Sequence, residues 1–202
     1  MALKDSGIKD ASISADGWCS DARRVLSPNC DSRANDKSCA GAQSSDISLL
    51  VIHNISLPPG EFGGPYIERL FTNCLSPDDH PYFVNIVDAE VSAHLLIGRD
   101  GECTQFVPFD QRAWHAGQSS FEGHERCNDF AIGIELEGTD TSGYTERQYA
   151  VLAEMTGALQ RRYPAITRER IVGHSDIAPG RKTDPGPGFD WHKFLALLEK
   201  TD

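Results

Sequence analysis

The segment Ala131-Ile132-Gly133-Ile134-Glu135-Leu136-Glu137 carries the clearest strand pattern in the chain. Side chains two positions apart on a strand point to the same face of a sheet. One face is therefore predicted to enter the core, and it consists of Ile132, Ile134 and Leu136. The opposite face combines Glu135 and Glu137 with the small residues Ala131 and Gly133. Two interpretations are open for it, a solvated face or a cleft in which one carboxylate acts as a general base.

Two further strands are expected to end at histidines. The apolar run Leu49-Leu50-Val51-Ile52 fits a buried strand and delivers His53 to its C-terminal end. Ile171-Val172 is a shorter strand that leads into Gly173-His174.

Local turn and capping signals define a hairpin and a helix. Residues 93–97 and 103–107 flank Asp100-Gly101, a dipeptide typical of a hairpin turn. Thr145-Glu146-Arg147-Gln148 is a capping box, and apolar residues at helical spacing follow it until Pro164 limits the helix.

Other segments complete the predicted fold. Residues 66–71 and a stretch from Asp190 to the C-terminal end are expected to be helical, residues 17–26 to form a short helix, and residues 27–46 to be a loop. Because strands and helices alternate along the chain, the predicted class is α/β (α+β), with a central mixed β-sheet flanked by helices.

Length and composition indicate one globular domain. The 202 residues are 39% hydrophobic and 24% charged, which suits a single core. We expect an N-terminal extension at residues 1–16 and the domain at residues 17–202. The net charge of −11 argues against nucleic-acid binding, which relies on Lys and Arg. No stretch approaches the ~20 apolar residues that span a bilayer, so no membrane partner is expected.

The N-terminal residues predict a cytoplasmic location. Residues 1–16 contain charged side chains and no apolar run of the kind found in secretory signals. Disulfides are rare in the cytoplasm, so the six cysteines are expected to be reduced and mostly structural.

Three residues are candidate metal ligands: His53, His174 in Gly173-His174-Ser175-Asp176, and Asp184 in Lys182-Thr183-Asp184-Pro185-Gly186. Catalytic zinc takes three protein ligands from His and carboxylate side chains and keeps a fourth position open. Two histidines and one aspartate meet that need. Each residue alone is weak evidence, because a histidine at a strand end is more often a hydrogen-bonded structural residue.

Five motifs occur in an order that is specific to one family. They are Val51-Ile52-His53-Asn54, Ser92-Ala93-His94, Arg112-Ala113-Trp114-His115-Ala116-Gly117, Asn128-Asp129-Phe130 with Gly133-Ile134-Glu135, and the run from Gly173 to Pro187. The chain resembles the N-acetylmuramoyl-L-alanine amidase family, and is most similar to its AmpD-type branch, the cytoplasmic anhydro-N-acetylmuramyl-L-alanine amidases of peptidoglycan recycling. The resemblance covers about Gly17 to Leu198. It implies the mixed sheet with flanking helices that peptidoglycan-recognition proteins and phage amidases share.

The resemblance also implies roles for individual residues. By matching position, the Zn²⁺ ligands are His53, His174 and Asp184. Many relatives have Cys at the third position, whereas this branch has Asp. Phage relatives place a catalytic Tyr where Ala93 stands, so the resemblance implies Glu135 as the general base. Lys182 matches the family's catalytic lysine, which would stabilise the oxyanion.

Four residues are expected to bind substrate: Asn54, Trp114, His115 and Arg126. A tryptophan offers a flat face for a sugar, although a core role for Trp114 is equally open. Arg126 is suited to a peptide carboxylate, with a solvated loop charge as the alternative. His94, next to the apolar Leu95-Leu96-Ile97, is interpreted as a core histidine with satisfied hydrogen bonds.

The expected function is zinc-dependent hydrolysis of the amide bond between (anhydro-)N-acetylmuramic acid and L-alanine in muropeptides, by a monomer. The main alternative is a non-catalytic peptidoglycan-recognition module of the same fold, which the filled ligand positions disfavour. A second alternative is a glycosidase that uses Glu135 and Glu137 as its two carboxylates, but this function would leave the histidines without a role. A non-haem iron oxygenase built on His174 and Asp176 has no further support.

Overall fold

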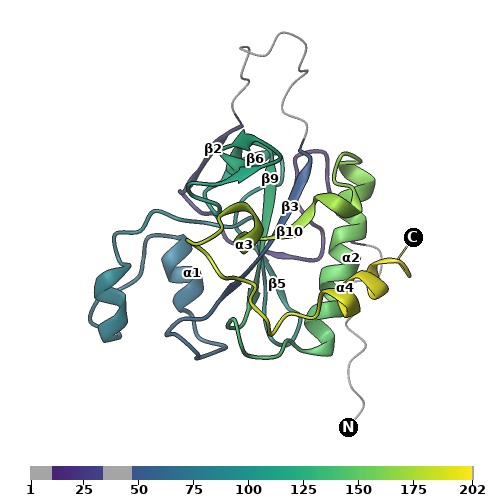
Figure 1. Ribbon diagram of the computed structural model, residues 1–202. Helices are drawn as coiled ribbons and strands as arrows, with labels where there is room; N and C mark the ends of the chain where they lie inside the picture. The colour runs from purple at the N-terminus through teal and green to yellow at the C-terminus, as the bar shows by residue number, and fades with distance from the viewer. Residues whose placement is uncertain (1–10, 34–46, 202) are drawn as a thin grey trace.

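Six strands form one mixed sheet (Figure 1) in the computed structural model, which describes residues 11–33 and 47–201. In spatial order the strands are β1 (Arg23–Arg24), β5 (Cys103–Gln105), β4 (Leu95–Ile97), β9 (Ala131–Glu137), β3 (Leu49–Ile55) and β10 (Ile171–Gly173). The four strands from β4 to β10 run parallel to their neighbours, β5 is antiparallel to β4, and β1 is parallel to β5. The mixed sheet and the hairpin between β4 and β5 are as predicted.

Helices lie on both sides of this sheet. Figure 1 shows α2 (Glu146–Arg162) and α4 (Trp191–Leu198) together on one side, and α1 (Tyr66–Phe71) on the other. The predicted capping box begins α2, where the Thr145 hydroxyl accepts from the Gln148 amide and the Gln148 side chain accepts from the Thr145 amide. The core under α2 includes the predicted apolar face of β9, which is Ile132, Ile134 and Leu136.

The acidic face of β9 is also covered, so it is not a solvated face. Every residue of β9 is buried. Against this face lie α3 (His174–Ile177) and a small apolar cluster that includes Leu49 and Val51 of β3. At the far end of the strand, the Glu137 carboxylate accepts hydrogen bonds from the backbone amides of Gly63 and Arg99. Glu137 is thus a structural residue.

Smaller elements complete the chain. Two two-stranded ladders pair β2 (Cys30–Ser32) with β6 (Gln111–Ala113) and β7 (Ser120–Phe121) with β8 (His124–Glu125). Three 3₁₀ helices are η1 (Pro81–Asn85), η2 (Cys127–Asp129) and η3 (Arg168–Arg170). The expected loop at residues 27–46 therefore contains a short strand, and its residues 34–46 lie outside the described part of the chain.

The predicted helix at residues 17–26 is wrong. That segment forms turns and then β1, because tertiary contacts outweigh its weak helical pattern. Gly17 has φ +81° and lies so close to the Phe109 and Asp110 backbone that a Cβ would sit 2.9 Å from their amide nitrogens. Upstream, Ala11 belongs to the main core cluster, although the domain boundary at residue 17 itself stays a prediction.

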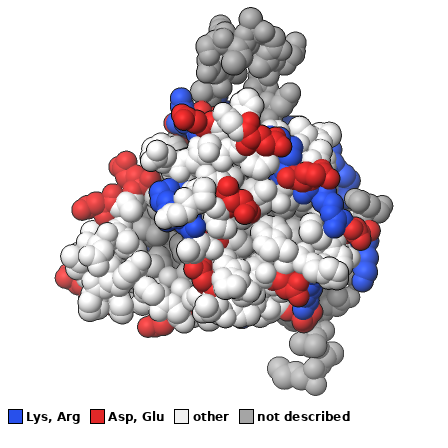
Figure 2. Space-filling view, in the orientation of Figure 1, with Lys and Arg blue, Asp and Glu red and all other residues white. Residues whose placement is uncertain are grey.

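The structure also bears on three further expectations from the sequence, which concern cysteine pairing, membrane spans and surface charge. The five cysteines within the described residues are free, and Cys39 lies outside them. None of the described helices is long and apolar enough to cross a membrane. On the face that Figure 2 shows, acidic and basic side chains are scattered rather than gathered into one basic surface.

Gly133 is a glycine for a steric reason. The ring of His115 packs against it, and a Cβ at this position would lie 2.4 Å from the His115 Cγ. The room that the small residues of β9 leave is therefore filled by an imidazole from the segment after β6.

We expect Gly133→Ala to lower the free energy of unfolding by about 1–3 kcal/mol, since overpacking a filled site forces side-chain or backbone shifts. Gly143→Ala is the matched control, because a Cβ there meets no atom within 4 Å. Denaturant unfolding of both variants measures the difference. Equal stability of the two would contradict the packing described for His115.

Candidate metal centre and active site

The pairing of β3 with β10 brings two histidines together. In the parallel register Gly173 lies opposite Ile52, so His174, the first residue of α3, lies beside His53. β3 continues to Ile55, two residues past the predicted end, which places His53 inside a strand rather than at its terminus.

Asp184 reaches the two histidines from the loop after α3. Its carbonyl oxygen accepts from the Ser175 amide at 3.0 Å. The next carbonyl, that of Pro185, accepts from the Tyr144 hydroxyl at 2.9 Å. These hydrogen bonds hold the loop against the start of α3 and against residues next to α2.

The three side chains converge on one point. His53 Nδ1 lies 2.9 Å from His174 Nδ1 and 3.1 Å from Asp184 Oδ2, and His174 Nδ1 lies 3.0 Å from the same Oδ2. The side chains of His53 and His174 are 1% and 3% exposed, and that of Asp184 is 13% exposed. Within the described residues this is the group whose ligand atoms are arranged to hold a metal ion.

The outer nitrogens of both histidines have partners that suit ligation through Nδ1. His174 Nε2 lies 3.1 Å from the Ala116 carbonyl, which only accepts, so a proton on Nε2 has a partner when Nδ1 ligates a metal. His53 Nε2 lies 2.9 Å from His115 Nδ1. When Nε2 of His53 donates to that nitrogen, its Nδ1 is free as well.

The ionisation states also suit a metal. Burial lowers the pKa of His53 to about 4, so the ring is neutral near pH 7. Burial alone would raise the pKa of Asp184, but hydrogen bonds with His174 and His53 outweigh it and hold the pKa below its usual value. Two imidazoles and one carboxylate form a donor set that fits zinc. Two donors roughly 2.0 Å from a tetrahedral zinc are about 3.3 Å apart, close to the spacings found here.

Glu135 stands next to this group. It pairs with His53 in the parallel register of β9 and β3, so both side chains lie on the same face. Its Oε2 is buried and has no hydrogen-bond partner within the described part of the chain. Burial, and then repulsion by Asp184, raises the pKa of Glu135 well above its usual value. A buried carboxylate oxygen without a partner is costly unless a ligand or reactant meets it.

A cavity of about 380 Å³ opens onto the site. The metal group and Glu135 form its floor together with His115. Lys182 is exposed and lies on its wall. Further lining residues are Asn54, Leu70, Phe71, Tyr82, Ile86, Val91 and Trp114. The structure thus brings the predicted ligands, Glu135 and Lys182 to one cavity.

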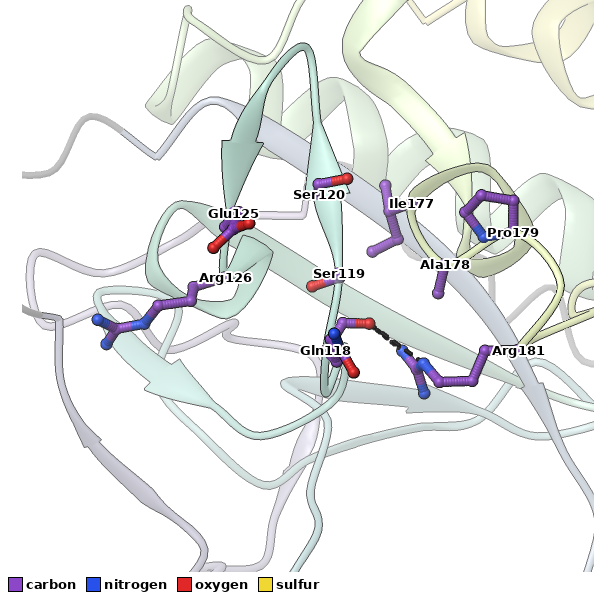
Figure 3. Close-up of a pocket in the computed structure, with 9 residues that line it drawn as sticks. All are labelled: Gln118, Ser119, Ser120, Glu125, Arg126, Ile177, Ala178, Pro179 and Arg181. Atoms are coloured by element: carbon purple, nitrogen blue, oxygen red, sulfur yellow. Dashed lines mark hydrogen bonds between the residues drawn. The ribbon is translucent and has the colours of Figure 1, made fainter.

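Among the predicted substrate-binding residues, Arg126 does not reach this cavity. Figure 3 shows it on a separate pocket beside Glu125, across from Arg181, whose side chain donates to the Gln118 carbonyl. Arg126 is 67% exposed and pairs with Asp129 at 3.1 Å. Asn54 lines the cavity but its side-chain amide donates to Asp140 at 2.8 Å. Substrate binding by these residues stays a prediction.

Two buried residues, His94 and Arg33, make hydrogen bonds with the backbone around the site. His94 accepts from the Gly133 amide and donates to the Gln111 carbonyl, as expected of a core histidine. Arg33 was not anticipated, because it falls in a polar segment without a pattern. Its guanidinium is buried and donates to the carbonyls of Asn128, Asp129, Phe109 and Ala131.

Known proteins share both the sequence and the fold. AmpD of Citrobacter freundii, a 1,6-anhydro-N-acetylmuramyl-L-alanine amidase, is 60% identical over 183 residues, which cover 91% of this chain and 93% of that protein. The Escherichia coli K12 enzyme of the same name is 58% identical over 184 residues, which cover 91% of this chain and 96% of that protein. A crystal structure of an AmpD selenomethionine derivative superposes with a TM-score of 0.85 at 59% identity and covers 92% of this chain and 98% of that one.

A more distant relative has been solved with substrate. The Escherichia coli amidase AmiD, in complex with anhydro-N-acetylmuramic acid-L-Ala-D-γ-Glu-L-Lys, has a TM-score of 0.57 at 27% identity and covers 94% of this chain and 66% of that one. The family model described as N-acetylmuramoyl-L-alanine amidase matches residues 43–187, which include every candidate ligand and Glu135. The chain belongs to the N-acetylmuramoyl-L-alanine amidase family.

Proposed function

We propose that this protein is a zinc-dependent amidase that hydrolyses the bond between 1,6-anhydro-N-acetylmuramic acid and L-alanine in muropeptides during peptidoglycan recycling. The observation that carries the proposal is the placement of Glu135 beside His53, His174 and Asp184 in the lining of one cavity, with its Oε2 buried and without a partner in the described residues. The relatives at about 60% identity bear the name of this activity.

His53, His174 and Asp184 would hold the metal. A zinc ion in such a site acts as a Lewis acid and lowers the pKa of a bound water towards about 7. The protein's part is to give each imidazole an outer partner at Nε2 and to keep the carboxylate ionised, which the contacts described above achieve.

Glu135 is proposed as the general base and then the general acid. It lines the cavity from the strand next to His53, and its buried Oε2 has no hydrogen-bond partner within the described residues. It takes the proton of the attacking water and returns it to the departing amine of L-alanine. Because burial raises its pKa, the carboxyl group can hold the proton between these two transfers.

Lys182 is proposed to stabilise the negative charge that develops on the lactyl carbonyl oxygen. Its side chain borders the cavity, and its backbone is fixed by the hydrogen bond from its amide to the Ala178 carbonyl at 3.0 Å. A well-placed donor to such an oxyanion is worth about 3 kcal/mol in the transition state.

The remaining walls suit an amphipathic sugar-peptide. Trp114, Tyr82 and Phe71 give the cavity aromatic surface near the polar floor. We assign the muramic sugar to this aromatic part of the cavity. Asn54, His115 and Arg126 are proposed as further substrate contacts. The cytoplasmic location and the monomeric state also stay predictions, and the free cysteines of the described residues agree with the former.

The structure disfavours the rival glycosidase. A glycosidase needs a second reactive carboxylate, but both oxygens of Glu137 accept hydrogen bonds from backbone amides. A pure binding module gives no reason to bury an unpaired Glu135 beside three metal donors.

The first test uses defined substrates. Purified protein with anhydro-muramyl tripeptide should release free tripeptide and anhydro-sugar, which mass spectrometry detects. The same assay with a muramyl tripeptide that lacks the anhydro ring measures how far this ring is required. A chelator should stop the reaction, and stoichiometric Zn²⁺ should restore it. Full activity of metal-free protein would overturn the zinc mechanism, and cleavage within the glycan would overturn the amidase assignment.

The second test separates the two glutamates of β9. Glu135→Gln should lower kcat by at least a hundredfold, because an amide cannot accept the proton, while zinc content stays at one per chain. Glu137→Gln is the matched control and should retain kcat within a few-fold, with its effect confined to stability. If the control loses activity and Glu135→Gln keeps it, the base has been assigned to the wrong carboxylate.

A further inference from the structure

Asn128 clamps the short segment that follows Trp114. Its Oδ1 accepts hydrogen bonds from two successive backbone amides, that of His115 at 3.2 Å and that of Ala116 at 2.8 Å. Asn128 lies in η2, immediately before β9, so the clamp ties this segment to the strand that carries Glu135.

The two clamped residues supply the outer partners of both histidine ligands, and His115 Nδ1 acts as the acceptor when His115 carries its own proton on Nε2. His115 Nδ1 lies 2.9 Å from His53 Nε2, and the Ala116 carbonyl lies 3.1 Å from His174 Nε2. The same carbonyl also accepts from Arg181 at 2.6 Å. One side-chain oxygen therefore controls the position of two acceptors that serve two different ligands.

These acceptors decide which nitrogen of each ligand is free. An imidazole that binds a metal through Nδ1 must carry its proton on Nε2, and an acceptor at Nε2 fixes both the tautomer and the plane of the ring. His115 cannot swing away from this role, because its ring packs on Gly133 and lies 5.6 Å from the ring of His94.

We propose that Asn128 is a positioning residue for the metal centre, acting on His53 through His115 and on His174 through Ala116. This inference rests on the zinc site of the proposed function. Asn128 is not among the residues that line the cavity, so its effect reaches the reaction through the ligands and not through contact with substrate.

The test measures Zn²⁺ affinity of the metal-free protein by competition with a chelating dye. Asn128→Ala removes the clamp and should weaken zinc binding by about 10–100-fold, the usual effect of losing an outer partner of a ligand. Asn128→Asp keeps an acceptor oxygen and should stay within a few-fold of the unaltered protein. Asp100→Ala is the control, because it removes a comparable side-chain to backbone bond, to Glu102, in the distant hairpin turn.

A second readout follows the ring nitrogens of the two ligands. Two-bond ¹H–¹⁵N spectra of the zinc-loaded protein should show His53 and His174 with the proton on Nε2, and Asn128→Ala should shift the Nε2–H signals of both. Should that variant fail to fold, His115→Phe keeps a ring against Gly133 and removes the acceptor of His53 alone, so it should perturb that histidine alone. Unaltered Nε2–H signals and unaltered zinc affinity in the folded variants would overturn the role of Asn128. Absence of zinc binding by the unaltered protein would instead overturn the proposed function.

Discussion

Parallel pairing of β3 with β9 on one side and with β10 on the other fixes the position of the reactive groups. The register sets His53 opposite Glu135 and Gly173 opposite Ile52. Because paired residues share a face, a one-residue slip of either strand would turn its side chains to the helix-covered face. The apolar positions beneath α2 prevent such a slip, so the core that stabilises the sheet also determines the geometry of the site.

The same strand face shows how environment separates two identical side chains. Glu135 and Glu137 are both buried, two positions apart. The carboxylate of Glu137 is satisfied by two backbone amides and joins loops to the sheet. Glu135 has an oxygen without a partner and faces the cavity, where burial raises its pKa. Hydrogen-bond partners, rather than residue type or strand face, distinguish the carboxylate that is proposed to react from the structural one.

Much of the fold and of the candidate site could be predicted from the sequence, because these features depend on local patterns. Alternation in β9 and the capping box at Thr145 predict their elements correctly, and the family motifs predict the group of His53, His174 and Asp184. Partners far apart in the chain could not be predicted. Arg33 meets carbonyls 76 to 98 residues away, and the helix expected at residues 17–26 is replaced by turns that Gly17 and distant backbone impose.

In the proposed metal centre, two imidazole nitrogens and one carboxylate oxygen hold a single zinc ion. X-ray absorption at the zinc edge of the zinc-loaded protein measures the ligand atoms directly. We expect only nitrogen and oxygen neighbours near 2.0 Å, with the multiple-scattering features of two imidazoles, and one such feature lost in His174→Ala. A sulfur neighbour near 2.3 Å, or a shell of oxygens without imidazole scattering, would contradict this account.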